Sequence, residues 1–352
     1  MLGDITENFN LRNKDKIQYP MFSVTNDRGF VPQSEQFEGR DMVGEDIKAY
    51  KIIHTNDFAY NPARINVGSI AMYTGERPCM ISSLYVCFKT TKEVNNEWLM
   101  QLLKTPKMNY YYNVNGEGGV RVYLFYPNFA RIRMSIPKIE EQKKIAKLLN
   151  LIDERIATQN KIIEDLKKLK SAISENLFKA VKGDVVILSE ICEIIKGKQV
   201  NSEFLSEKGK YYVMNGGTEP SGYYSDYNVE ANTISISEGG NSCGYVQFNT
   251  SPFWSGGHCY TIQKIADNVD HLYLYHYLKS KEDAIMKLRI GSGLPNIQKK
   301  DLAMFKIKLP TVEQQKSIST FLSSLERKAE IEERIRNSIL DEKRCLLHQM
   351  FI

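Results

Sequence analysis

The chain has 352 residues, a length that allows two or three domains that each bury a core. Its net charge is +5. No segment approaches the roughly 20 apolar residues of a membrane span, and the N-terminus lacks the layout of a signal peptide, so we expect a cytoplasmic protein. Six cysteines lie scattered without metal-ligand spacing, which argues against a zinc site or a disulfide framework.

Residues 1–135 have the pattern of a β-rich α/β domain. Alternating or β-branched residues at 69–73 and 84–88 predict strands, and Gly, Asn and Pro clusters bound them. An amphipathic helix is expected at 96–104. The loops mix Gly, Asn, Tyr and Arg, and the candidates for contact with DNA bases or phosphates are Arg28, Asn61, Arg64 and Arg121. The same residues also suit ordinary turns.

Residues 136–182 follow with a long helical pattern behind Pro137, whose fixed φ suits the start of a helix. Apolar residues alternate at spacings of four and three, which is typical of a coiled-coil seam rather than of a broad core-facing stripe. The predicted seam residues are Ile145, Leu149, Ile152, Ile156, Ile163 and Leu166. Gln159 and Lys170 interrupt the seam and would disfavour slipped registers.

Residues 183–308 repeat the order of parts seen in the first domain. A strand is expected at 233–237 and an amphipathic helix at 271–288. The loops again carry Gly, Asn, Tyr and Ser, and the candidates for DNA contact are Asn215, Tyr223, Asn241 and Ser292.

Residues 309–352 hold a second long helix behind Pro310, at an offset of 173 from the first (310 − 137 = 173). Its predicted seam residues are Ile318, Leu322, Leu325 and Ile339. The polar interruptions recur at the same points, with Glu332 over Gln159 and Lys343 over Lys170. Such a repeat predicts a pseudo-two-fold molecule with an internal antiparallel helix pair. The alternative is that these helices dimerise two chains.

Sequence motifs of catalysis are missing. There is no G-x-x-x-x-G-K-[ST] loop, no H-E-x-x-H helix, no G-x-S-x-G elbow and no Asn-Pro-Pro-aromatic motif for amine methylation. His258 and Cys259 are adjacent, but neighbours in a strand point to opposite faces. We therefore expect a non-catalytic chain without a bound cofactor or metal.

The layout resembles the specificity (S) subunit of type I restriction-modification systems over the whole chain. The resemblance rests on the motif P-x-x-x-E-Q-x-x-I at Pro137–Ile145 and again at Pro310–Ile318, where Gln314 replaces the usual glutamate. Asp57–Pro62, Asn215–Tyr224 and Gly291–Ile297 add to it. The tryptophan-bearing lead-in before the first domain is missing, so its first strand is expected to be short.

The resemblance implies an α+β fold: two β-rich α/β target-recognition domains joined and separated by two long antiparallel coiled-coil helices. Each domain would read one half of a split double-stranded DNA site. The helices would set the spacer and dock two methyltransferase (M) subunits that bind S-adenosylmethionine, with translocase-nuclease (R) subunits joining for restriction. The seam from Ile145 to Leu177 would span roughly 50 Å at about 1.5 Å per residue, which exceeds the roughly 34 Å between half-sites one DNA turn apart.

Two other functions remain open from the sequence. The chain could be the specificity segment of a single-chain restriction enzyme, although nuclease and methylase motifs would then be expected in the same polypeptide. It could also be a coiled-coil scaffold whose loops bind proteins or glycans, in which case it would have no affinity for DNA. The resemblance further implies a bacterial or archaeal cytoplasm.

Overall fold

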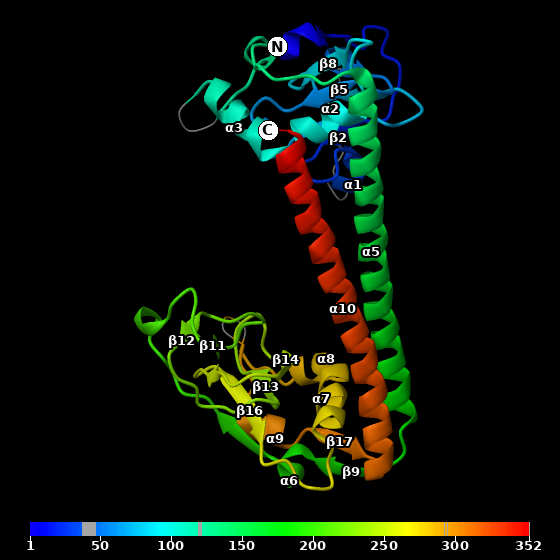
Figure 1. Ribbon diagram of the computed structural model, residues 1–352. Coiled ribbons are helices and arrows are strands. Elements are labelled where there is room, and N and C mark those ends of the chain that lie inside the picture. Colours follow the sequence, from blue (N-terminus) through cyan, green and yellow to red (C-terminus); the bar gives the residue numbers. More distant parts are fainter. Residues whose placement is uncertain (37–46, 119–121, 292, 294, 352) are drawn as a thin grey trace. The chain divides into compact units, whose positions relative to one another are not determined.

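The computed structural model describes residues 1–36, 47–118, 122–291, 293 and 295–351. These residues form two compact units. Unit 1 combines Met1–Thr158 with Ile335–Ile352, and unit 2 is Gln159–Arg334. Both long helices, α5 (Ile139–Ala180) and α10 (Val312–Met350), contribute to each unit (Figure 1). The sequence repeat predicts that the chain divides into four parts at residues 135/136, 182/183 and 308/309, and this division stays a prediction.

Unit 1 is built from short strands and helices that precede α5. Its elements are η1 (Leu2–Asp4), β1 (Thr6–Phe9), β2 (Phe22–Val24), β3 (Phe30–Pro32), α1 (Gln33–Gln36), η2 (Ile47–Ala49), β4 (Lys51–Ile53), β5 (Phe58–Tyr60), η3 (Ile65–Val67), β6 (Ile70–Met72), β7 (Cys79–Ile81), β8 (Val86–Thr90), α2 (Asn96–Leu103), α3 (Pro106–Asn115) and α4 (Tyr126–Ala130). The second expected strand begins at Val86 instead of Leu84, because Ser82–Tyr85 form a turn in which Tyr85 N–H donates to the Ser82 carbonyl.

Unit 2 repeats this order between the two long helices. Its elements are β9 (Asp184–Ile187), α6 (Leu188–Ile191), β10 (Glu193–Lys196), η4 (Ser202–Phe204), β11 (Tyr211–Met214), β12 (Tyr223–Tyr224), β13 (Thr233–Ser237), β14 (Val246–Asn249), β15 (Trp254–Ser255), β16 (Cys259–Gln263), α7 (His271–Ser280), α8 (Glu282–Met286), α9 (Lys299–Ala303) and β17 (Lys306–Leu309). The single helix expected at 271–288 is wrong, because Lys281 leaves the helical conformation (φ −108°, ψ 16°) and α8 then turns Ile285 into the core.

The two units contain the same four-stranded antiparallel sheet. The strand order is β1-β8-β5-β6 in unit 1 and β10-β16-β13-β14 in unit 2. One helix covers each sheet: Trp98 and Leu102 of α2 are buried with Phe58 and Phe88, and α7 is buried in the same way in unit 2. The internal repeat is therefore present in the strand pairing as well as in the helices.

The packing of the long helices gives their direction. The start of α5 is buried in the core of unit 1 at Leu149, together with Phe351, the residue that follows the end of α10. The end of α5 is buried with the start of α10 in the core of unit 2, at Phe178 and Leu322. The helices are therefore antiparallel within one chain. None of the helices in the described part of the chain has the length and apolar character needed to cross a membrane.

Candidate nucleic-acid interface

Three of the residues predicted to contact DNA lie on adjoining loops of unit 1. Arg28 is exposed in the turn between β2 and β3, and Arg64 is exposed at the N-cap of η3. Asn61 is half-buried, and its Oδ1 accepts a hydrogen bond from the Ala63 N–H at 3.0 Å. Asn61 therefore already shapes its own turn, whereas the two arginine side chains are at the surface.

The two arginine-bearing loops touch at a glycine. A Cβ on Gly68, which has φ +99°, would lie 3.0 Å from the Asn26 carbonyl oxygen. Next to it, the Ser69 hydroxyl donates to the Val24 carbonyl at 2.8 Å. The structure thus brings the Arg28 and Arg64 loops together, although their contact with DNA stays a prediction.

The predicted residues Arg121 and Ser292 lie outside the described residues. The described residues that flank them pair in the same way, with bridges at Glu117–Tyr123 in unit 1 and Ile290–Asn296 in unit 2. The two bridges are equivalent under the repeat, since 290 − 117 = 173.

Three further predicted residues lie in unit 2. Asn215 is half-buried and its Oδ1 accepts from the His258 N–H at 3.1 Å, while Asn241 is exposed in the loop after β13. Their loops meet where the Ser237 hydroxyl donates to the Gly216 carbonyl at 2.6 Å. Tyr223 is half-buried on β12, in a separate three-stranded sheet. The structure therefore groups the two asparagine loops and places Tyr223 on another element.

Sequence reasoning missed a charged cluster in unit 2. The Glu238 side chain is buried, and its Oε1 accepts from Lys196 Nζ at 2.6 Å and from the Tyr260 hydroxyl at 3.0 Å. His258 Nδ1 lies 3.9 Å from the other carboxylate oxygen. Lys196 and His258 remain exposed, so the buried carboxylate holds the Lys196 ammonium group at the surface with His258 beside it, where phosphates or base edges could meet them. The sequence Glu238-Gly239-Gly240, directly after strand β13, was the feature that could have pointed to this cluster.

Helix α3 in unit 1 was also missed. Its exposed face carries Asn109, Tyr110 and Asn113, and the Asn66 amide donates to Asn113 Oδ1 at 3.0 Å. The helix contains no acidic residue, and asparagine side chains can pair with adenine in the major groove, which admits an α-helix. Three successive tyrosines hide its helical periodicity, which is why the sequence pattern did not predict it.

The repeated motif has a direct structural explanation in its glutamine. Gln142 is buried at the start of α5, where its Oε1 accepts from the Asn95 N–H at 2.8 Å. Its Nε2 donates to the carbonyls of Glu93 at 3.2 Å and Pro137 at 2.8 Å. Since Asn95 is the N-cap of α2, one amide fastens the long helix to the domain helix.

Gln315 makes the same three hydrogen bonds in unit 2. Its Oε1 accepts from the Asp270 N–H at 2.8 Å, and its Nε2 donates to the carbonyls of Asn268 at 3.1 Å and Pro310 at 2.9 Å. Gln314, which replaces the usual glutamate of the motif, is exposed. The replacement of glutamate by Gln314 therefore falls on a solvent-facing position and leaves the three hydrogen bonds of Gln315 intact.

The predicted seam residues are all buried or half-buried. Leu149, Ile163, Leu322 and Ile339 are buried. The half-buried ones are Ile145, Ile152, Ile156, Leu166, Ile318 and Leu325. Their spacing of three and four residues keeps one stripe of each helix inside the pair.

Each polar interruption of the seam has a polar partner on the other long helix. In unit 2, Gln159 Nε2 donates to the Glu332 carboxylate, a contact between two residues that the repeat makes equivalent (332 − 159 = 173). Lys170 Nζ lies 2.7 Å from Glu326 Oε1 in the same unit. In unit 1, Lys343 Nζ lies 2.6 Å from Asp153 Oδ1. Both lysine pairs are copies of one interaction, since 343 − 170 = 326 − 153 = 173.

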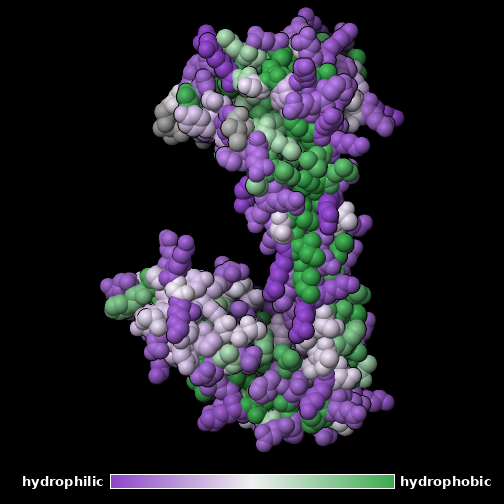
Figure 2. Space-filling model, in the orientation of Figure 1, coloured by the Kyte–Doolittle hydropathy of each residue, from purple (hydrophilic) through white to green (hydrophobic). Residues whose placement is uncertain are grey.

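A second, exposed apolar pattern runs beside the seam. In unit 1 it includes Leu148 (41% exposed) and Ile335 (38%), each one residue before a seam position. Their repeat equivalents in unit 2 are Phe321 (46%) and Ile162 (38%). Figure 2 shows hydrophobic residues in green along the visible side of the long helices. Each unit therefore carries exposed apolar residues at the same two positions, which are called its apolar positions.

His276 should make unit 2 sensitive to acid. Burial, reinforced by the nearby Lys170 cation, lowers its pKa to about 4, and its Nε2 lies 2.9 Å from Ser323 Oγ. The unfolded chain takes up a proton near pH 6.5 while the folded chain stays neutral, so stability is lost as pH falls from 6.5 towards 4. The loss should be on the order of 2 kcal/mol.

Urea denaturation between pH 7 and 4.5 would measure this loss. His276→Gln should flatten the slope, because Gln101 at the equivalent place in unit 1 forms amide hydrogen bonds to Asn150 and Asp153. His271→Gln, at an exposed position, is the control and should keep the slope. Equal slopes in wild type and His276→Gln would contradict the assignment.

Comparison with known proteins decides the family. The model of the type I restriction modification DNA specificity domain matches the chain twice, at residues 4–168 and 181–341. The chain belongs to this family. It is thus a type I restriction-modification specificity subunit with two target-recognition domains.

Relatives and solved structures agree with this assignment. A putative type I restriction enzyme specificity subunit (MjaX) from Methanocaldococcus jannaschii is 25% identical over 96% of this chain and 87% of its own length. A putative type I specificity subunit from Mycoplasma pneumoniae is 34% identical over 41% of this chain and 38% of its own length. The crystal structure of a type I S subunit from M. genitalium covers 100% of this chain and 95% of its own, with a TM-score of 0.68 at 16% identity, so the specificity subunit shares that fold.

Proposed function

We propose that each recognition domain reads one half of a bipartite double-stranded DNA site and that the antiparallel helices set the spacer between the halves. Two methyltransferase subunits dock on the helices, and translocase-nuclease subunits join for restriction. S-adenosylmethionine binding, methyl transfer and cleavage then belong to those partners, and this chain contributes recognition alone.

One observation carries the proposal: the two units share a frame but differ in the side chains that it presents. Ala59 pairs with Cys87 in unit 1, and Ser235 pairs with Thr261 at the matching place in unit 2. Two residues after Ala59 lies Asn61, and two residues after Ser235 lies Ser237, so the same position carries an amide in unit 1 and a hydroxyl in unit 2. Equal scaffolds with unlike polar groups suit the reading of two different sequences.

A domain exchange tests independent reading. We expect that replacing residues 183–309 with the equivalent segment of a relative changes one half-site and leaves the other unchanged. The exchange should extend to Leu309, because β17 pairs with β9 along its whole length. The methylated motif of the reassembled enzyme, read by single-molecule sequencing, is the measurement. A motif altered in both halves would contradict separate reading.

The exposed apolar positions support docking of two copies of one partner. Leu148 with Ile335, and Phe321 with Ile162, form one pattern in each unit at equivalent positions. Apolar side chains beside a helix seam are suited to pack a further helix. Exposed apolar residues at equivalent positions of the two units suit two copies of one subunit, in agreement with two methyltransferase copies.

Glutamate substitutions at the apolar positions of unit 1 should remove one partner copy. Leu148→Glu with Ile335→Glu should reduce the bound methyltransferase from two subunits to one, because a charge desolvated in the contact costs several kcal/mol. Native mass spectrometry of the complex gives the count. The controls Lys147→Glu and Thr320→Glu lie at exposed positions one residue before Leu148 and Phe321, and they should retain two subunits. If the variant with Leu148→Glu and Ile335→Glu retained two subunits, these positions would not be part of the docking surface.

A further inference from the structure

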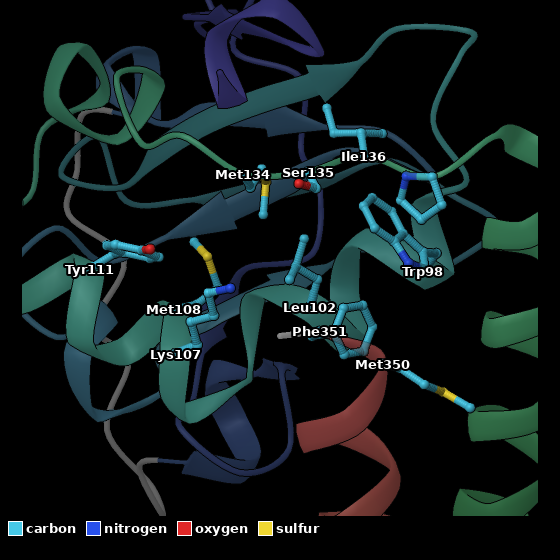
Figure 3. A pocket seen from close by; sticks show the side chains of 11 residues that line it. Trp98, Leu102, Lys107, Met108, Tyr111, Met134, Ser135, Ile136, Met350 and Phe351 are labelled. Carbon is cyan, nitrogen blue, oxygen red and sulfur yellow. The ribbon is translucent and has the colours of Figure 1, made fainter.

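Helix α3 in unit 1 turns one side towards the domain and the other towards solvent. Met108 is buried, and Figure 3 shows Met108 and Tyr111 among the residues that line a pocket of about 200 Å³ on the inner side of the helix. Asn109, Tyr110 and Asn113 are exposed, and the exposed fraction of Tyr110 is 63%. The polar side of α3 therefore takes no part in the core of the unit.

A chain of asparagine amides holds the polar side of α3 in place. Asn66 of η3 donates to Asn113 Oδ1 at 3.0 Å, and Asn113 Nδ2 donates to Asn109 Oδ1 at 3.3 Å and to the Asn109 carbonyl at 2.9 Å. Among the described residues, none accepts a hydrogen bond from Asn109 Nδ2. The Oδ1 atom also keeps a second lone pair. Asn109 is therefore fixed in direction and retains a donor and an acceptor for a ligand.

The surroundings of these amides suit a polyanion. Helices α3 and η3 contain no acidic residue, while Lys107 on α3 and Arg64 at the N-cap of η3 are exposed. Basic side chains contact the phosphates of DNA, and asparagine can pair with the edge of adenine. This surface thus combines groups for phosphate contact with an amide for base recognition.

Helix α8 occupies the equivalent place in unit 2 but has the opposite charge. Tyr110 corresponds to Asp283, since 283 − 110 = 173, and Asp283 is exposed. The other acidic residue, Glu282, serves the fold, because its Oε2 accepts from the first N–H of β14 at 2.9 Å. A Cβ on Gly244, in the loop before β14, would lie 2.9 Å from Met286 Cα, so α8 adjoins that loop as α3 adjoins η3. An exposed carboxylate repels phosphates, which makes α8 unsuited to enter a DNA groove.

We propose that α3 enters the major groove of the half-site that unit 1 reads and that Asn109 pairs with an adenine there. The adenine N6 amino group donates to Asn109 Oδ1, and Asn109 Nδ2 donates to adenine N7, a pattern that only adenine offers in this groove. Asn113 is a positioning residue that sets the direction of the Asn109 amide. Unit 2 keeps α8 outside the groove and reads its half-site through its loops. Both assignments rest on the function proposed above, in which each domain reads one half of a DNA site.

An adenine analogue tests the pair with Asn109. The methylated motif and the domain exchange described above give the half-site of unit 1. Each adenine on either strand of it, other than the methylated base, is replaced in turn by 7-deazaadenine, which lacks N7. One replacement should weaken DNA binding by the wild-type complex about fivefold, the strength of one hydrogen bond. It should not weaken binding by Asn109→Ala, since alanine preserves the helix and offers no donor.

The two proteins together decide the assignment. Equal losses for the wild type and Asn109→Ala, or no loss at any adenine of the half-site, would overturn the pair. Asn113→Ala should reduce the penalty of the same replacement, because Asn109 then loses its fixed direction, and an unchanged penalty would overturn the positioning role. A complex that reads no bipartite motif would instead contradict the proposed function itself.

A transferred charge tests which helix lies in the groove. Tyr110→Asp copies Asp283 into unit 1 and should weaken DNA binding by about tenfold or more relative to the neutral Tyr110→Asn, because a carboxylate would then face the DNA. Asp283→Asn at the equivalent position of unit 2 should leave the methylated motif unchanged. Equal binding by the two Tyr110 variants would place α3 outside the groove, and an altered half-site of unit 2 in Asp283→Asn would overturn the placement of α8.

Discussion

Replacing Gln142 by leucine is expected to lower the free energy of unfolding by about 3 kcal/mol, because three buried backbone groups lose their partner at once. These are the Asn95 N–H and the carbonyls of Glu93 and Pro137. Gln315→Leu should cost unit 2 a similar amount, since its three bonds are copies of the first set. A leucine of similar volume keeps the packing and removes only the polar contacts.

Urea denaturation followed by tryptophan fluorescence can assign each loss to a unit. The chain has two tryptophans, Trp98 in unit 1 and Trp254 in unit 2. Variants that keep one tryptophan should show the Gln142→Leu shift mainly through Trp98. Gln314→Leu is the matched control at the exposed neighbour of Gln315 and should stay within about 0.5 kcal/mol. If Gln314→Leu lowered the free energy of unfolding as much as Gln315→Leu, the hydrogen bonds of the buried glutamine would not explain the motif.

Lengthening both helices by one heptad is expected to widen the spacer of the recognised DNA site. Seven residues after Gln159 and seven after Glu332 add about 10 Å to each helix and rotate the seam by only about 20°. The two half-site sequences should stay the same. At about 3.4 Å per base pair along a strand, the spacer should grow by two or three base pairs, or less if DNA twist limits the facing of the half-sites.

The inserted heptads can copy residues 160–166 and 333–339, so that the seam continues through the added turns. They separate Gln159 from Glu332 but keep Lys170 with Glu326 and Lys343 with Asp153, each pair within its own unit. Five-residue insertions at the same places turn the seam about 140° away and should abolish assembly. The methylated motif is again the readout, and an unchanged spacer with full activity would mean that the helices do not set the distance.

The two long helices and their seam were predictable from the sequence by itself. The spacing of residues such as Leu149 and Leu322 is a local signal, because a helix repeats every 3.6 residues whatever lies around it. The internal repeat was visible for the same reason, and with it the antiparallel pair and the two recognition domains. Strands at 69–73 and 233–237 were also expected from their alternation.

Only the tertiary structure decided how distant residues meet. Gln142 reaches Asn95, and Lys343 reaches Asp153. These pairings join residues far apart in the chain, and no local periodicity encodes them. Helix α3 and the Glu238 cluster could be recognised only from the tertiary structure, which determines which of their residues are exposed. Recognition loops have the least periodic sequences, so the residues that contact DNA remain the least predictable part.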